Sequence, residues 1–132
     1  HYRDLYHVEK DARVATRAED AEFQNTPESE KDFQRWLNLN VHREPFDPEL
    51  WSIAWHSNQP IGIVLGEVNN GVGNVQEVST SRAWKRKGIA HALLLETLHA
   101  FQVKGITKVR IYTDATNEHG ARTLMNVSGS AK

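Results

Sequence analysis

Residues 75–94, VQEVSTSRAWKRKGIAHALL, decide the fold of this chain. The first six alternate as a β-strand, and from Ile89 onward apolar residues recur at helical spacing as far as Phe101. Between these two segments lies a basic bend that ends at Gly88. A strand that passes through a short bend into a long helix predicts the first half of a strand–helix–strand crossover.

The second half of the crossover follows directly on the C-terminal side. Gly105 is a typical residue for the end of the long helix, and residues 108–113, KVRIYT, alternate as a strand. The crossover implies that this strand runs parallel to residues 75–80 in a mixed sheet. Residues 118–127 are predicted to form a short final helix.

On the N-terminal side, two strands and two helices precede the crossover. Residues 50–56 and 60–68 are rich in aromatic and β-branched side chains, and the polar link between them predicts an antiparallel hairpin. Residues 69–74 are expected to form the next turn. The first forty residues are polar and helical in pattern, so no strand is expected before residue 45.

Composition limits the class of protein. The 132 residues suit one domain, and 16 basic against 17 acidic residues create no field that would recruit nucleic acid or an anionic membrane. No apolar run reaches the roughly 20 residues of a membrane span, and the charged N-terminus does not have the pattern of a signal peptide. With no cysteine, the chain has no thiol catalysis and fits a cytoplasmic location. Its seven histidines form no credible metal-ligand set.

The basic bend is the strongest candidate for a ligand site. Unpaired N–H groups and the helix dipole favour an anion at the start of a helix, and Gly88 allows a phosphate to approach the backbone. Lys85, Arg86 and Lys87 bring positive charge to the same place, so a pyrophosphate could be held without a metal. The alternative is an ordinary solvated turn before an amphipathic helix.

Two segments together resemble the GNAT acetyltransferase family. Lys85–Ala90 is similar to the family's pyrophosphate signature, with Lys85 where Arg or Gln is usual. Residues 113–117, TDATN, and 120–124, GARTL, resemble the family's next conserved block. The resemblance extends over residues 50–125, is looser in the N-terminal helices, and is greatest to the mycothiol-synthase-like members.

The resemblance implies an α/β fold, a mixed β-sheet flanked by helices, and an N-acetyltransferase that moves an acetyl group from acetyl-CoA to a primary amine, favoured to be a small molecule. The backbone around Val78 and Thr80 would bind the pantetheine arm, and Asn117 would lie near it. Phe46 and the segment around Arg43 would form a wall of the acceptor site. The pyrophosphate would be held by the bend and the helix start, Lys85, Arg86, Lys87, Gly88, Ile89 and Ala90.

The resemblance also shows where this chain departs from the family. Met125 occupies the position of a tyrosine that often protonates the leaving thiolate, and a thioether cannot donate a proton. Asn74 appears at the position of a glutamate base. Glu77 is nearby, but strand alternation puts its side chain on the face of the sheet opposite to that of Asn74 unless a bulge intervenes. The simpler interpretation of Glu77 is an ordinary solvent-facing acid on a strand. Glu77 and Asn117 are therefore the catalytic candidates.

Two further expectations follow from these departures. The first strand and the last two strands of the family are not apparent, so the domain of residues 1–132 is expected to be incomplete at one or both ends. A homodimer or a tandem domain would then cover the edges of the sheet. The alternative function is a catalytically degenerate domain that binds coenzyme A or another protein.

Overall fold

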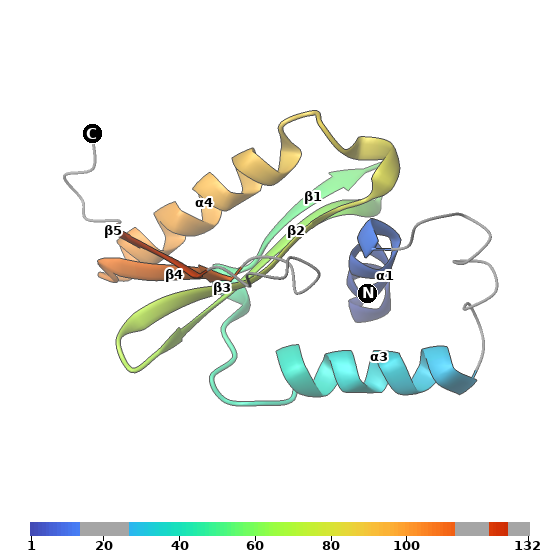
Figure 1. Cartoon of the computed structure of the whole chain (residues 1–132), viewed down its shortest axis with the longest axis horizontal. Helices are drawn as coiled ribbons and strands as arrows, with labels where there is room; N and C mark the ends of the chain where they lie inside the picture. The colour runs from blue at the N-terminus through green and yellow to red at the C-terminus, as the bar shows by residue number, and fades with distance from the viewer. Residues whose placement is uncertain (14–26, 113–121, 127–132) are drawn as a thin grey trace.

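The computed structural model describes residues 1–13, 27–112 and 122–126, and these build a five-stranded sheet with helices on both faces (Figure 1). The strands lie in the order β1-β2-β3-β4-β5. The chain runs through α1 (Tyr2–Arg13), α3 (Pro27–Asn40), η1 (Pro48–Leu50), β1 (Ser52–His56), β2 (Gln59–Asn69), β3 (Val72–Thr80), η2 (Arg82–Trp84), α4 (Ile89–Val103), β4 (Lys108–Tyr112) and β5 (Arg122–Asn126).

Helices α1 and α3 cover one face of the sheet, and α4 covers the other (Figure 1). The two N-terminal helices are joined by polar contacts: the Tyr6 hydroxyl donates to Asp32 over 2.8 Å, and the Trp36 indole N–H donates to Glu9 over 2.6 Å. Their buried stripe meets β2 in one cluster, whose buried members are Leu5, Tyr6, Val8, Phe33, Trp36, Ile63 and Leu65.

The hairpin predicted from residues 50–68 is confirmed, since β1 and β2 pair antiparallel. Its turn consists of Ser57 and Asn58, whose φ angles of 49° and 65° are those of a two-residue turn that matches strand twist. The second turn is shorter than predicted, because Asn70 and Gly71 suffice, with φ angles of 55° and 78°. Strand β3 therefore begins three residues earlier than expected, at Val72.

Glycines on β2 and β3 allow α4 to approach the sheet closely. A Cβ added to Gly62 would lie 2.9 Å from Ile89, and one added to Gly66 would lie 3.0 Å from the ring of Phe101. A Cβ on Gly73 would lie 2.8 Å from the ring of Phe101. The backbone of the sheet is thus bare where the helix lies on it.

The predicted crossover is confirmed, with β3 and β4 parallel and α4 between them in the chain. The helix begins at Ile89 and ends at Val103, before Gly105 with its φ of 81°. The core on this face contains Leu50, Val64, Val75, Leu93, Leu98, Phe101 and Val109. A mixed sheet flanked by helices is therefore the observed fold.

The prediction of a final helix over residues 118–127 is wrong for the part that the structure describes. Residues 122–126 form strand β5, which pairs antiparallel with β4. Strand β4 would otherwise present an edge of unpaired backbone groups, and pairing with β5 satisfies them. Tertiary pairing overrides the weak helical preference of this short segment.

A bulge interrupts the pairing of β2 with β3. Leu65 lies opposite Glu77, and Gly66 lies opposite Val75, so Gln76 is an extra residue without a partner across the ladder. Because residues opposite each other share a face, Glu77 lies on the face of Leu65, which is the face of α1 and α3. The extra residue moves every side chain after it to the face opposite to the one that simple alternation gives.

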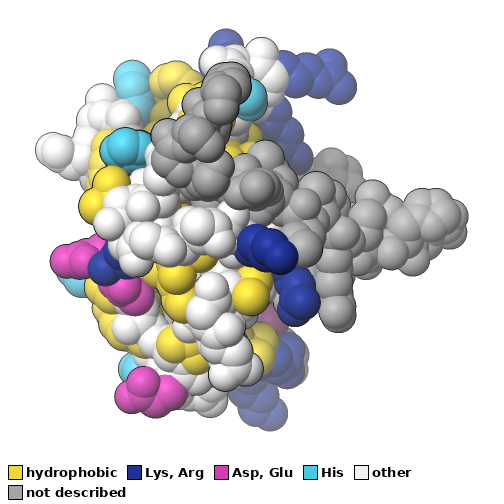
Figure 2. Space-filling model, turned by 90° about the vertical axis from the view of Figure 1, so that its left-hand side faces the viewer, with side chains coloured by type: hydrophobic (Ala, Val, Ile, Leu, Met, Phe, Trp, Pro, Cys, Tyr) yellow, Lys and Arg dark blue, Asp and Glu magenta, His cyan; other side chains and the backbone are white. Residues whose placement is uncertain are grey.

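No helix in the described ranges 1–13, 27–112 and 122–126 is both long and apolar enough to cross a bilayer. On the face shown in Figure 2, basic and acidic side chains both occur, in agreement with the formal net charge of −1.

Candidate functional site

A pocket of about 440 Å³ lies where β3 ends and α4 begins. Strand β3 contributes Val78, Ser79 and Thr80, and Ala12 closes one side from the end of α1. The remaining lining comes from the connecting loop and the first turn of α4: Trp84, Lys85, Arg86, Gly88, Ile89, Ala90 and His91. The structure thus brings together the predicted coenzyme-binding residues between 78 and 90, except for the exposed Lys87.

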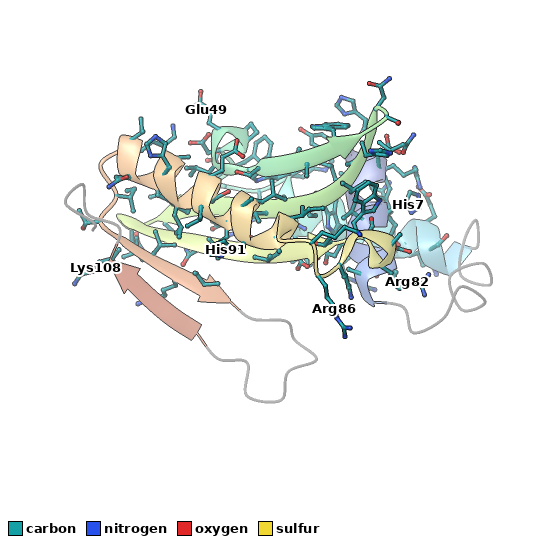
Figure 3. The ribbon with its side chains drawn as sticks, turned by 90° about the horizontal axis from the view of Figure 1, so that it is seen from above. His7, Glu49, Arg82, Arg86, His91 and Lys108 are labelled. Atoms are coloured by element: carbon teal, nitrogen blue, oxygen red, sulfur yellow. The ribbon has the colours of Figure 1, made fainter. Side chains whose placement is uncertain are left out.

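The edge of β3 beside this pocket is open. Pairing between β3 and β4 consists of Gly73–Val75 with Val109–Ile111 and goes no further within the described residues. Figure 3 shows β4 turning away from β3 toward the end of the molecule that carries Arg86. The Oγ1 atom of Thr80 is buried there without a hydrogen-bond partner in the part of the chain described. An open strand edge and an unpartnered hydroxyl are features that a hydrogen-bonding ligand would satisfy.

The start of α4 opens into the same pocket. Gly88 is the residue before the helix, it has a φ of 80°, and it makes no side-chain capping bond. A Cβ added to Gly88 would meet no atom within 4 Å, so space remains beside the free N–H groups of the first turn. Arg82, Arg86 and His91 surround this end of the helix (Figure 3). The arrangement is that of an anion site at a helix N-terminus.

The three basic side chains of the bend do not act alike. Lys85 donates from Nζ to the carbonyl oxygen of Ala12 over 2.9 Å, so its charge lies at the C-terminal end of α1. Arg86, with a φ of 63°, and Lys87 are exposed. Arg86 thus lines the pocket and Lys87 does not, whereas Lys85 fastens the loop to α1.

Asp11 fastens the same loop and was not identified from the sequence. Its carboxylate accepts the Arg82 backbone N–H over 2.7 Å and the Arg82 guanidinium over 3.3 Å. One acid thus holds both the backbone and the side chain of the first residue of η2. A charged residue at the end of a polar helix gives no sequence signal of this contact.

We expect Asp11→Asn to lower the free energy of unfolding by about 1 kcal/mol, because it removes a charged acceptor from a pair that is only partly buried. The loosened loop should also bind coenzyme A about fivefold more weakly. Urea unfolding and calorimetric titration measure the two effects. Asp4→Asn is the matched control, since the Asp4 side chain is half exposed and contacts the N-terminal amine. Equal coenzyme A affinity in both variants would contradict the expectation.

The bulge brings the two predicted base positions to one face. Glu67 on β2 lies opposite Asn74, and Leu65 lies opposite Glu77, so the side chains at 67, 74 and 77 all face α1 and α3. Glu77 is half-buried and accepts a hydrogen bond from the buried Ser79 hydroxyl. The solvent-facing reading of Glu77 is therefore wrong, because the strand is bulged.

Glu67 is a buried acid that sequence reasoning missed. Its side chain is 7 % exposed and accepts a hydrogen bond from the Arg43 guanidinium over 3.2 Å. Burial raises the pKa of Glu67, and Arg43 opposes that shift only in part. A single acid within the apolar run PIGIVLGEV was the available signal, because ionised residues are seldom buried without a role or a partner.

This raised pKa predicts how stability depends on pH. The folded chain holds a proton on Glu67 more tightly than the unfolded chain does. The protonated side chain therefore contributes to the free energy of unfolding, and this contribution is fully present at pH values below the pKa of glutamate in the unfolded chain. It is lost as the pH rises through the pKa of Glu67 in the folded protein. In Glu67→Gln, therefore, the free energy of unfolding should change less with pH across that window. Chemical denaturation at a series of pH values checks this, with Glu96→Gln on the exposed side of α4 as the control.

Several predicted site residues lie outside the described part of the chain. Asn117 and the rest of residues 113–121 are among them. Met125 is on β5 opposite Val109, so the helical setting assumed for it is wrong. Its assignment to the general-acid position remains a prediction. Among the described residues, no group of three or more His, Cys, Asp or Glu side chains could hold a metal ion.

Comparison with known proteins agrees with this geometry. The model of the Acetyltransferase (GNAT) family matches residues 5–125. No curated protein matches the chain.

Solved structures with the same fold include three acetyltransferases. The PaiA N-acetyltransferase from Thermoplasma acidophilum in complex with coenzyme A has a TM-score of 0.59 at 19% identity, covering 90% of this chain and 77% of its own. A GCN5-related N-acetyltransferase from Sphaerobacter thermophilus has a TM-score of 0.57 at 26% sequence identity. The match covers 92% of this chain and 37% of that protein. The third is diaminobutyrate acetyltransferase EctA from Paenibacillus lautus, in complex with L-2,4-diaminobutyric acid and coenzyme A. Its TM-score is 0.57 at 16% sequence identity, and the match covers 89% of this chain and 63% of EctA.

The chain spans less than two thirds of the length of two of these three structures. The family match, by contrast, covers all but the ends of the chain, from the first helix to the last strand. This chain belongs to the GNAT family of acetyltransferases.

Proposed function

We propose that this chain is an N-acetyltransferase that takes its acetyl group from acetyl-CoA and delivers it to a primary amine of a small molecule. The observation that carries the proposal is the pocket between the open edge of β3 and the start of α4. It offers a backbone edge for an extended amide-containing arm and helix N–H groups for a diphosphate. Coenzyme A contains both of these groups in that order.

The residues present fit this ligand. The free edge of β3 at Val78 and Thr80 would supply backbone partners for the arm, and both residues line the pocket. The first turn of α4 behind Gly88 would hold the diphosphate, with Arg86 in the lining of the pocket and the exposed Lys87 next to it in the chain. The pocket volume of about 440 Å³ is within the range of cofactor sites.

The reaction forms a C–N bond at the thioester carbonyl carbon and breaks the C–S bond, with the thiolate as leaving group. Because β3 and β4 close on each other at Val75 and Ile111, an arm lying along β3 would end beside the bulge at Gln76. The side chains at that level on the α1–α3 face include Glu77, which is the candidate proton acceptor. Positioning supplies much of the acceleration in such a reaction, since thiolates leave readily. We retain Asn117 as a candidate that contacts the arm.

Titration with acetyl-CoA tests the proposal directly. Trp84 lines the pocket and its ring lies 4.6 Å from that of His56, so ligand entry should change its fluorescence. Trp84→Phe separates this signal from those of the other three tryptophans. Absence of binding at millimolar acetyl-CoA, in a protein shown to be folded by circular dichroism, would overturn the proposal.

A second candidate is a domain that binds coenzyme A without catalysing transfer. It is supported by Asn74, which appears where a glutamate base is expected, and by Met125 at the predicted acid position. Thioester consumption across a panel of primary amines distinguishes the two functions. L-2,4-diaminobutyric acid belongs in the panel because it is bound in the EctA structure. Binding without turnover would favour the second candidate.

The sheet also suggests a partner. Strand β1 lies at the end of the sheet, and in the described residues its outer edge pairs with no strand. A second copy of the chain or a tandem domain would cover this edge. Analytical ultracentrifugation of the chain distinguishes a dimer from a monomer.

A further inference from the structure

His91 is an exposed histidine in the first turn of α4, and it lines the pocket between β3 and α4. Figure 3 shows its place on α4, with Arg86 on the loop that leads into the helix. Histidine is the side chain whose charge ordinarily changes between pH 5 and 8. The described lining of the pocket therefore includes a group that can gain a positive charge near neutral pH.

Two of the other cationic side chains at this end of α4 are paired with α1. Lys85 donates from Nζ to a carbonyl oxygen at the end of α1 over 2.9 Å, and the Arg82 guanidinium pairs with Asp11 over 3.3 Å. Arg86 lines the pocket, and no acid pairs with it in the described part of the chain. Lys87 is exposed but does not line the pocket. Arg86 is thus the lining cation that is left for a ligand.

This positive charge does not balance the diphosphate of coenzyme A, which carries two negative charges near neutral pH. The N-terminus of a helix contributes roughly half an elementary charge. Arg86 contributes one more, which leaves the diphosphate partly uncompensated. A protonated His91 in the same lining would supply the missing positive charge.

The acids near the pocket do not compete for this histidine in the described part of the chain. The pocket lining contains no carboxylate there. Asp11 pairs with Arg82, and Glu77 accepts a hydrogen bond from a neighbouring serine. On α4 itself the nearest acid, Glu96, is five residues from His91 and projects from another side of the helix.

The other titratable groups around the pocket are basic. Lys85 and Arg86 come from the loop, and His56 at the end of β1 contacts Trp84, with ring centroids 4.6 Å apart, without lining the pocket. Like charges and a helix N-terminus both disfavour a further cation, whereas a bound anion favours one. The charge of His91 should therefore depend on whether an anion occupies the pocket.

We propose that His91 takes up a proton when coenzyme A binds, so that the affinity of the pocket for the coenzyme falls as the pH rises. The inference rests on the proposed function for the identity of the ligand. Because linkage is reciprocal, an anion that favours the charged imidazole is itself bound more tightly by the chain in which that imidazole is charged. His91 is thus a coenzyme-binding residue whose contribution is present below neutral pH and is lost above it.

Dephospho-coenzyme A is the probe for this linkage. It keeps the diphosphate and lacks the 3′-phosphate, a group that itself gains a proton near pH 6. Calorimetric titration should give a dissociation constant about tenfold lower at about pH 6 than at about pH 8, as for one hydrogen bond between charged groups. At about pH 7, titrations in Pipes and in imidazole buffer, whose ionisation enthalpies differ, should show net proton uptake on binding.

Histidine variants assign the effect to one side chain. His91→Gln should bind the probe at the lower pH as weakly as the unmodified chain does at the higher pH, and it should take up no proton. His99→Gln, at an exposed position eight residues further along α4, is the matched control and should keep the pH dependence. His56→Gln is a second control and should keep it as well. Circular dichroism at each pH shows that the variants are folded.

The outcomes separate this inference from the proposed function. Equal affinity at both pH values in the unmodified chain would overturn the inference and leave the proposed function in place. A pH dependence that persists in His91→Gln, or that disappears in His56→Gln instead, would have the same effect. Failure of both dephospho-coenzyme A and acetyl-CoA to bind at any pH would overturn the inference and the proposed function together.

Discussion

Gly88→Val should weaken the binding of coenzyme A about a hundredfold, equivalent to about 2.7 kcal/mol, while the chain remains folded. Gly88 has a φ of 80° and precedes the free N–H groups of α4. A β-branched residue at this φ is strained, and relief of the strain would turn these groups away from the pocket. Its side chain would also occupy the space where the diphosphate approaches. Calorimetric titration with coenzyme A measures the change.

Gly71→Val is the control for backbone strain. Gly71 has a φ of 78° in the turn between β2 and β3, and a Cβ there would likewise meet nothing within 4 Å. Both variants should therefore lose a similar amount of stability in urea, about 1–2 kcal/mol. Only the Gly88 variant should lose affinity. If the two variants bound coenzyme A equally well, the start of α4 would not be the diphosphate site.

Phe101→Ala should lower the free energy of unfolding by about 4 kcal/mol. Phe101 is fully buried, and its ring lies against bare backbone: a Cβ built on Gly66 would be 3.0 Å from it, and one built on Gly73 would be 2.8 Å from it. No side chain on these two glycines could move into the space left by the ring. The cavity would therefore persist, so we expect the full loss that is usual for a buried phenylalanine, about 3–5 kcal/mol. Urea denaturation followed by circular dichroism measures it.

Val103→Ala is the matched control on the same helix. Val103 is 72% exposed near the end of α4, and its truncation should change stability by less than about 0.5 kcal/mol. A Phe101 variant as stable as the Val103 variant would mean that α4 does not pack on the glycines of β2 and β3 as described.

Much of the fold was predictable because the decisive segments have strong periods. The aromatic and β-branched runs of β1 and β2 predicted the hairpin, and the long apolar stripe of α4 with the glycine after it predicted the crossover. The pocket beside the bend could be anticipated in part, since all of its lining residues but Ala12 lie between Val78 and His91. Its binding of coenzyme A remains a proposal. The periodicity of apolar residues predicts a strand or a helix well when the segment's own residues determine its conformation.

What escaped prediction depends on contacts between distant segments. The bulge at Gln76 leaves no mark in the sequence, because an alternating strand with one extra residue still reads as a strand. Strand β5 was misread as a helix, since only its pairing with β4 decides its conformation. Asp11 and Glu67 were missed for the same reason, as their partners Arg82 and Arg43 lie far away in the chain.

The extra residue at position 76 has a consequence for sequence variation in this strand. Loss of that single codon would leave the composition of β3 almost unchanged and would still read as a regular strand. Gly66 would still lie opposite Val75 and Leu65 opposite Glu77, so the bulge would disappear while the side chains on both sides of it kept their present faces. Loss of one residue elsewhere in β3 would instead turn the residues on one side of the gap to the other face of the sheet, so alignments of relatives should place a one-residue gap in this strand at position 76.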